Sequence, residues 1–259
     1  MSMPSRALPW PSDAPVLPVA PLRPTIDRFS SLALRFPADL EAIPGLAMGE
    51  EETAADLPPS LEQVADEFGG IRRHGITELS LLLEDRSDVG PYTLMGKATA
   101  FVPLQESPET AIVLSIDPDG APGAVYGIGE DLALYLAAPD LAGWLSRVAD
   151  ALDASLAAIP SEEEDADVRA ETAEQGMDER LYAEVLGMRD LEAMTTLPLQ
   201  RPDAAGIDDL PAGTVAVADL REAPLGTRVD LVDADVEGDP LAHHVVFAHG
   251  GRVVCLVAD

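Results

Sequence analysis

The chain has 259 residues, 47 of them acidic and 16 basic, which gives a formal net charge of −31 at neutral pH. Such a surface repels phosphate backbones and anionic headgroups, so the charge excludes direct binding to nucleic acid or to a membrane surface and favours basic protein partners. No apolar run approaches the roughly 20 residues that span a bilayer, and a single cysteine, Cys255, excludes a disulfide within the chain. We therefore expect a cytoplasmic protein.

The first part of the chain changes character near residue 25. Residues 1 to 24 contain seven prolines and predict an extended, flexible arm. The apolar residues between Thr25 and Leu46 predict a short helix followed by a strand. Ser60, with Gln63 three residues later, has the pattern of a capping box, and predicts a helix from Ser60 to Gly69 that stops at Gly69-Gly70.

Strand signals dominate the middle of the chain. Apolar runs rich in β-branched residues predict strands at 76–83 and 93–104, and a further strand at 132–137. Between the last two lies the run from Ala111 to Ile128, where two apolar segments flank the sequence DPDG at 117–120. Pro and Gly at these positions set the backbone angles of a tight turn, so the run predicts a β-hairpin.

The same DPDG sequence also resembles part of a calcium loop. With Gly120 at the sixth position of an EF-hand loop, Ser115, Asp117 and Asp119 fall on ligand positions. The twelfth position, which requires a bidentate Glu, is then Tyr126. The turn chemistry is complete and the ligand set is not, so the hairpin is favoured.

The chain after the hairpin divides into three parts. Asp140 to Leu156 carries apolar residues at spacings of three and four and predicts an amphipathic helix. Residues 160–190 are strongly acidic and predict a solvated linker or helix. Residues 191–259 contain short apolar strands and a hairpin that turns at Gly250-Gly251, which predicts a small β-rich region. The order of elements predicts an α+β fold with a mostly antiparallel curved sheet packed by helices.

Candidate catalytic and metal-binding residues do not form a recognisable set. His243 and His249 would lie about 20 Å apart along one strand, too far to share a metal ion. Cys255 lies within an apolar run, and the sequence has no nucleophile elbow, phosphate loop or complete dinucleotide fingerprint. We therefore expect no catalytic residues, no metal and no cofactor, and an enzyme is the minority hypothesis.

The central segment resembles the SUKH superfamily. The similarity rests on LPPSL at 57–61 leading to FGGI at 68–71, and on GAVY at 123–126 followed by AAPDLAGWL at 137–145. It covers roughly residues 55 to 155. The resemblance implies an α+β fold, placed here at 25–159, in which helices pack against a curved sheet. Many bacterial members of that family are immunity proteins that bind and neutralise toxins, frequently nucleases; others are regulatory scaffolds.

The function predicted from the sequence is therefore binding to another protein. The leading hypothesis is an acidic immunity protein that covers a basic, nuclease-type toxin. A housekeeping adaptor or regulatory scaffold, acidic only for solubility, is the alternative. The acidic residues expected to contact the partner are Asp85, Asp88, Glu130 and Asp131. The sequence makes no prediction of oligomeric state.

Overall fold

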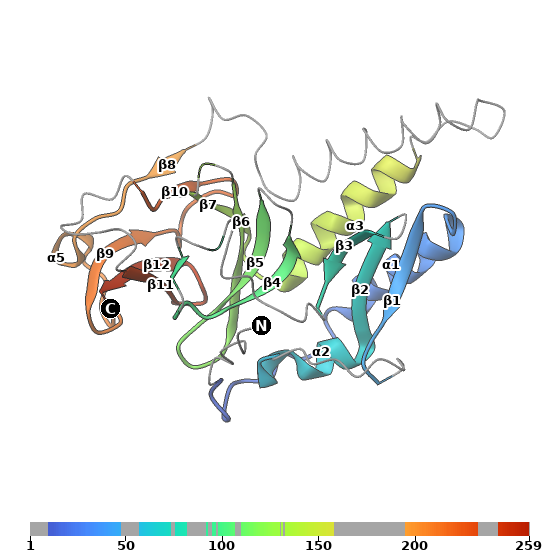
Figure 1. Cartoon of the computed structure of the whole chain (residues 1–259), viewed down its shortest axis with the longest axis horizontal. Helices are drawn as coiled ribbons and strands as arrows, with labels where there is room; N and C mark the ends of the chain where they lie inside the picture. The colour runs from blue at the N-terminus through green and yellow to red at the C-terminus, as the bar shows by residue number, and fades with distance from the viewer. Residues whose placement is uncertain are drawn as a thin grey trace, which may run out of the picture.

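The fold is known from a computed structural model, which describes residues 10–47, 57–73, 76–81, 92, 95–96, 98–106, 110–129, 131, 133–157, 195–232 and 243–258. It is an α+β fold with mostly antiparallel sheets, as the sequence predicts (Figure 1). No helix within these residues is both long and apolar enough to cross a membrane.

The helices and strands follow one another along the chain in the order α1 (Arg23–Arg35), β1 (Leu40–Pro44), η1 (Pro59–Leu61), α2 (Glu62–Glu67), β2 (Phe68–Arg73), β3 (Ile76–Ser80), β4 (Phe101–Glu106), β5 (Ala111–Ile116), β6 (Pro122–Ile128), β7 (Ala133–Ala138), α3 (Leu141–Ala157), β8 (Thr196–Leu197), α5 (Pro202–Ala205), β9 (Thr214–Asp219), β10 (Arg228–Asp230), β11 (His243–Ala248) and β12 (Val253–Ala258).

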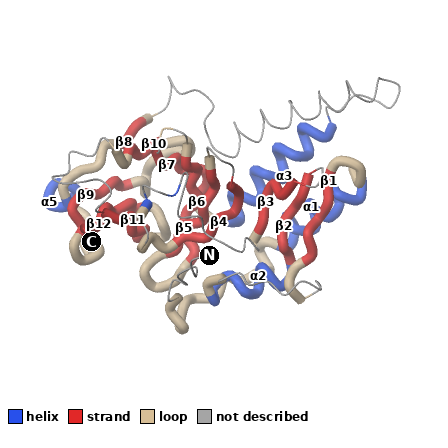
Figure 2. Tube along the Cα trace, in the orientation of Figure 1, coloured by secondary structure: helices blue, strands red, loops and turns tan. Residues whose placement is uncertain are grey.

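The strands form three sheets, which we name by their place in the chain. The N-terminal sheet has the order β1-β2-β3, the central sheet β4-β5-β6-β7-β10-β8, and the C-terminal sheet β11-β12-β9. Neighbouring strands are antiparallel except β10 and β8, which run parallel. The tube view shows the central sheet between the other two (Figure 2).

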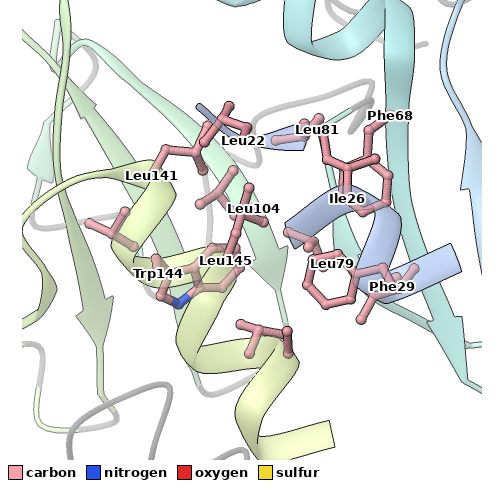
Figure 3. Packing of buried hydrophobic residues seen from close by; sticks show 14 of the residues in the cluster. Leu22, Ile26, Phe29, Phe68, Leu79, Leu81, Leu104, Leu141, Trp144 and Leu145 are labelled. Atoms are coloured by element: carbon pink, nitrogen blue, oxygen red, sulfur yellow. The ribbon is translucent and has the colours of Figure 1, made fainter. Parts of the chain in front are cut away.

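The central sheet is buried on both faces. Alternate residues of β5 point to opposite sides: Ile112 and Leu114 belong to a core shared with α1, α3 and the N-terminal sheet, whereas Val113 belongs to a core shared with the C-terminal sheet. Figure 3 shows the first of these cores, where Leu145 of α3 and Leu104 of β4 lie near Leu79 and Phe29. A third, smaller core lies on the outer face of the C-terminal sheet, against the α5 segment.

The α3 helix forms where the sequence predicts it, because both its start and its apolar stripe are encoded locally. The Asp140 side chain accepts a hydrogen bond from the Gly143 N–H at 2.7 Å, and its carbonyl accepts one from the Trp144 N–H at 3.1 Å. Asp140 is therefore an N-cap that satisfies one of the free donors of the first turn. The stripe predicted from the spacing, including Trp144, Leu145 and Leu152, is fully buried.

The DPDG hairpin also forms as predicted. Strands β5 and β6 pair in antiparallel register, and the Asp119 carboxylate accepts a hydrogen bond from the Ala121 N–H across the turn. Gly120 has φ +83°, the left-handed conformation that glycine adopts without strain. The strand predicted at 132–137, the helix and strand predicted between Thr25 and Leu46, and the turn at Gly250-Gly251 are likewise confirmed.

Three local predictions need correction. Ser60 is not an N-cap but lies within η1, and its hydroxyl is buried without a hydrogen-bond partner. Gly69-Gly70 does not end the preceding helix in a loop; both residues belong to β2, where a Cβ on Gly70 would collide with the backbone of Leu79. Of the strand predicted at 93–104, only the part from Phe101 onward is a strand among the described residues.

The proline-rich segment is not a free arm over the part that is described. Val19 and Leu22 are buried in the core, and the Leu17 N–H donates to the Ser60 carbonyl at 2.8 Å. The prolines thus favour an extended path, but apolar residues between them attach that path to the domain. Residues 1 to 9 lie outside the described residues.

The strands of the C-terminal region do not all belong to one sheet. Strand β10 pairs with β7, so residues 228–230 extend the central sheet, and β8 pairs with β10 in turn. Strands β9 and β10, two of the short strands expected within 191–259, therefore belong to two different sheets. The predicted linker at 160–190 lies outside the described residues.

We expect Asp140→Ala to lower the free energy of unfolding by about 1 kcal/mol, the usual cost of removing an N-cap side chain. Asp140→Ser, which keeps a capping oxygen, is the matched control and should retain most of the stability. Urea unfolding monitored by circular dichroism measures both. Equal losses in the two variants would mean that the cap contributes nothing and that another property of Asp140 is involved.

Candidate functional site

A network of hydrogen bonds joins the DPDG turn to the turn of the C-terminal hairpin. Both oxygens of the Asp117 carboxylate accept backbone hydrogen bonds, one from Gly250 and one from Gly251, each at 2.8 Å. The Ala124 N–H donates to the Gly250 carbonyl at 3.0 Å, and the Tyr126 hydroxyl donates to the Gly251 carbonyl at 2.5 Å. The stretch that could be mistaken for a calcium loop thus binds another part of its own chain.

Burial controls the titration of the groups in this junction. It raises the pKa of the Asp117 carboxyl, and the hydrogen bonds from Gly250 and Gly251 offset that rise only in part. The neighbouring Asp119 carboxylate raises the pKa further, whereas His249 lowers it. The pKa of Tyr126 is raised well above its ordinary value, chiefly by burial, so its hydroxyl remains a hydrogen-bond donor at neutral pH.

A second polar cluster lies where β7 meets β10. The Arg228 guanidinium forms ion pairs with Asp131 at 2.9 Å and with Asp230 at 2.8 Å, and the Tyr135 hydroxyl donates to the Asp131 carboxylate at 2.5 Å. Burial opposes ionisation of Asp131, but the hydrogen bonds from Tyr135, Arg228 and the Ala133 N–H outweigh it and lower the pKa. Burial and the bond to Asp131 raise the pKa of Tyr135 to about 12.

Of the four predicted contact residues, the structure describes one. Asp131 is part of this internal cluster, where it pairs with Arg228 of β10 and Tyr135 of β7, and its role as a partner contact stays a prediction. Asp85, Asp88 and Glu130 lie outside the described residues, so their role as partner contacts stays a prediction. No sequence pattern indicates the pairing of Asp131 with Arg228, because the two residues are 97 positions apart.

The histidines and the cysteine form no assembled site in the described chain. No group of three or more His, Cys, Asp and Glu side chains within the described residues is arranged to hold a metal ion. His243 lies at the start of β11 and is buried, whereas His249 is exposed in the turn. Burial raises the pKa of the Cys255 thiol to about 11, which keeps it protonated at neutral pH.

The arginines are largely engaged within the fold. Those that form ion pairs with carboxylates of the described chain are Arg23, Arg28, Arg35, Arg72, Arg201, Arg221 and Arg228. Arg252 instead donates to the carbonyls of Leu220, Arg221 and Ala223. These bonds hold the loop that follows β9 against the C-terminal hairpin.

Several exposed carboxylates have no such partner. Those that make no ion pair within the described part of the chain are Asp13, Asp27, Glu62, Asp66, Asp208, Asp209 and Glu222. They come from the N-terminal segment, from α1 and α2, and from the loops that follow α5 and β9. The acidic excess of the composition is therefore displayed on several surfaces of the described fold.

Comparisons with known proteins leave the family open. No family model matches the chain, and neither a curated protein nor a solved structure matches it. The resemblance to the SUKH superfamily therefore stays a prediction.

The lowered pKa of Asp131 makes its contribution to stability dependent on pH. A group with a lowered pKa in the folded state stabilises the fold above its unfolded pKa and loses that contribution as the pH falls through the folded value. We expect Asp131→Asn to be less stable than the original chain at pH 7, with the difference shrinking below about pH 4, the region of an ordinary Asp pKa.

Urea unfolding of the two proteins at pH 7 and pH 3 measures this difference. Asp66→Asn is the control, because Asp66 is exposed and makes no ion pair in the described chain, and this variant should match the original at both pH values. A penalty for Asp131→Asn that grows as the pH falls would contradict the ion pair with Arg228.

Proposed function

We propose that the chain is a non-enzymatic, acidic protein-binding module whose partner is a basic protein. The observation that carries the proposal is the contrast between arginines that form ion pairs and exposed carboxylates that form none within the described chain. An ion pair at the protein surface contributes little free energy, and each of its charges already has a counter-charge. Carboxylates without an ion pair, by contrast, remain available to attract Lys and Arg side chains of an approaching protein.

The partner that we propose is a toxin of the basic, nuclease type. A nuclease cleft must attract a polyanion, so its cationic groups suit a carboxylate-rich surface equally well. The SUKH resemblance supports the same class of partner. Neutralisation would follow from coverage of the cleft and would require no catalytic residue on this chain.

The outer face of α1 is the surface that we propose for the contact. Asp27, Ser31 and Leu34 follow one another at spacings of four and three residues, so they lie on one side of the helix. The opposite side packs into the core through Ile26, Phe29 and Leu32. Leu34 is 83% exposed, the highest value among the large apolar side chains of the described chain that stand out from the surface.

An exposed leucine on the same helix face as a carboxylate suits a two-stage encounter. The carboxylates attract the partner from a distance, and the apolar side chain is then buried at the centre of the contact. A lone exposed leucine is common on protein surfaces. The proposal therefore rests on its position on the helix face that also carries Asp27, and it is tested by substitution.

The full chain, used as bait in a lysate of its host at low salt, should capture a basic protein that mass spectrometry identifies. We expect the association rate of the purified pair to fall at least about tenfold between 10 mM and 150 mM NaCl, because the Debye length falls from about 30 Å to about 8 Å. The dissociation rate should change less, since buried contacts are poorly screened. Surface plasmon resonance measures both rates.

An association rate independent of salt would contradict electrostatic steering. Turnover of a small-molecule substrate with no captured protein would favour an enzyme. A captured partner without toxic activity would favour the adaptor or regulatory scaffold that the sequence left open.

Leu34→Ser should speed dissociation of the captured partner several-fold, because truncating a buried anchor costs about 1–2 kcal/mol of binding free energy. Leu225→Ser is the matched control, since Leu225 is 42% exposed and lies in the loop before β10, away from α1. Equal effects of the two substitutions on the dissociation rate would show that the outer face of α1 is not the contact surface.

A further inference from the structure

The Gly250-Gly251 dipeptide is held in the manner of a bound peptide. All four of its backbone polar groups are bonded to residues of the β5–β6 hairpin: the two N–H groups donate to Asp117, and the two carbonyls accept from Ala124 and Tyr126. Asp117 and Gly251 are 134 positions apart in the chain. This contact therefore arises from the tertiary fold and not from a local turn.

The site requires glycine at position 251 for steric reasons, whereas a Cβ on Gly250 would meet no atom within 4 Å. A Cβ on Gly251 would lie 2.5 Å from the Ala124 nitrogen and would also collide with the Ser115 hydroxyl. On the other side, a Cβ on Gly123 would lie 2.6 Å from the Gly250 carbonyl carbon. The two backbones thus approach as closely as only glycines allow.

The conformation of the turn places its donors toward the carboxylate. His249, Gly250 and Gly251 have φ values of +53°, +69° and +72°, three successive residues in the left-handed region. Successive N–H groups in such a conformation converge on one point and form a small anion-binding concavity. The Asp117 carboxylate occupies that point with one oxygen for each donor.

The surroundings support the contact from both sides. The Ser115 hydroxyl donates to the Ala124 carbonyl at 2.7 Å, which fixes the strand that carries the Ala124 N–H. The Tyr126 ring stacks on Phe247 with centroids 5.2 Å apart, and this brings the Tyr126 hydroxyl to the Gly251 carbonyl. The same tyrosine thus contributes to both the apolar and the polar part of the junction.

We propose that the β5–β6 hairpin carries a recognition site for a Gly-Gly turn, and that the chain's own Gly250-Gly251 occupies it as a latch that holds the C-terminal sheet on the central sheet. Apolar packing between the two sheets favours contact but does not choose one alignment. The latch supplies directional bonds at one end of the β11–β12 hairpin. The Asp117 carboxylate acts as an internal ligand of the concavity formed by the N–H groups of Gly250 and Gly251.

The test compares two aspartates of the same turn. Asp117→Ala removes the internal ligand, whereas Asp119→Ala removes a carboxylate that accepts only from the Ala121 N–H within the turn. We expect Asp117→Ala to speed hydrogen exchange of the β11, β12 and β9 amides by at least about tenfold, since two hydrogen bonds to a charged acceptor are lost. Exchange in α3 should remain unchanged, and Asp119→Ala should leave both regions unchanged.

Formate provides a second readout, because it is the carboxylate that the substitution removes. Sodium formate at about 0.5 M should slow exchange of the β11–β12 amides in Asp117→Ala relative to sodium chloride at the same concentration, by mass action at the vacated concavity. It should have no such effect on the original chain, whose concavity is occupied. If Asp117→Ala does not fold, Asp117→Asn, which keeps the side-chain volume and one acceptor oxygen, replaces it.

Three outcomes would overturn the proposal. Equal exchange in Asp117→Ala and Asp119→Ala would show that the carboxylate does not hold the sheet. A uniform increase that includes α3 would mean that Asp117 contributes to global stability and is not a latch for one sheet. Formate and chloride with identical effects would exclude an anion-binding concavity.

Discussion

The central sheet is apolar on both faces, and the layers of the molecule follow from that constraint. Every residue of β5 is buried, so neither side of this strand tolerates water. One face is covered by α3, α1 and the N-terminal sheet, and the other by the C-terminal sheet. Because a sheet with two apolar faces needs two separate covers, segments from both ends of the chain are required to complete the two cores.

Apolar burial is non-directional, so other contacts must align the covers. On the α3 side, Arg28 bridges α1 to Asp150 and Asp153 through ion pairs that are partly exposed and therefore weak. On the other side, the alignment depends on the bonds between Asp117 and the Gly250-Gly251 turn. Burial of that carboxylate is unfavourable by itself, and its two backbone donors make the cost tolerable only while the C-terminal sheet stays in place.

What could be predicted from the sequence was local. The DPDG turn and the start of α3 after Asp140 depend on residues within a few positions of each other, and both appear as expected. The partner of Asp117 could not be predicted, because a carboxylate in a turn gives no sign of the distant amides that it accepts. The pairing of Asp131 with Arg228 could not be predicted for the same reason: the arginine is contributed by β10, which joins the central sheet from the far end of the chain. The role of Asp131 as a partner contact stays a prediction.

The net charge of the chain can be read from the sequence, but the ion pairs that neutralise part of it are formed by the fold. Net charge governs association and solubility rather than fold. Within the described fold, however, it matters which carboxylates have cations: Asp131 and Asp153 are engaged in pairing strands and helices, whereas Asp27 and Asp66 are not. We therefore expect a partner to bind where a helix packs against the core with one side and exposes its other side to solvent. The α1 helix, with Phe29 in the core and Leu34 in solvent, meets that condition.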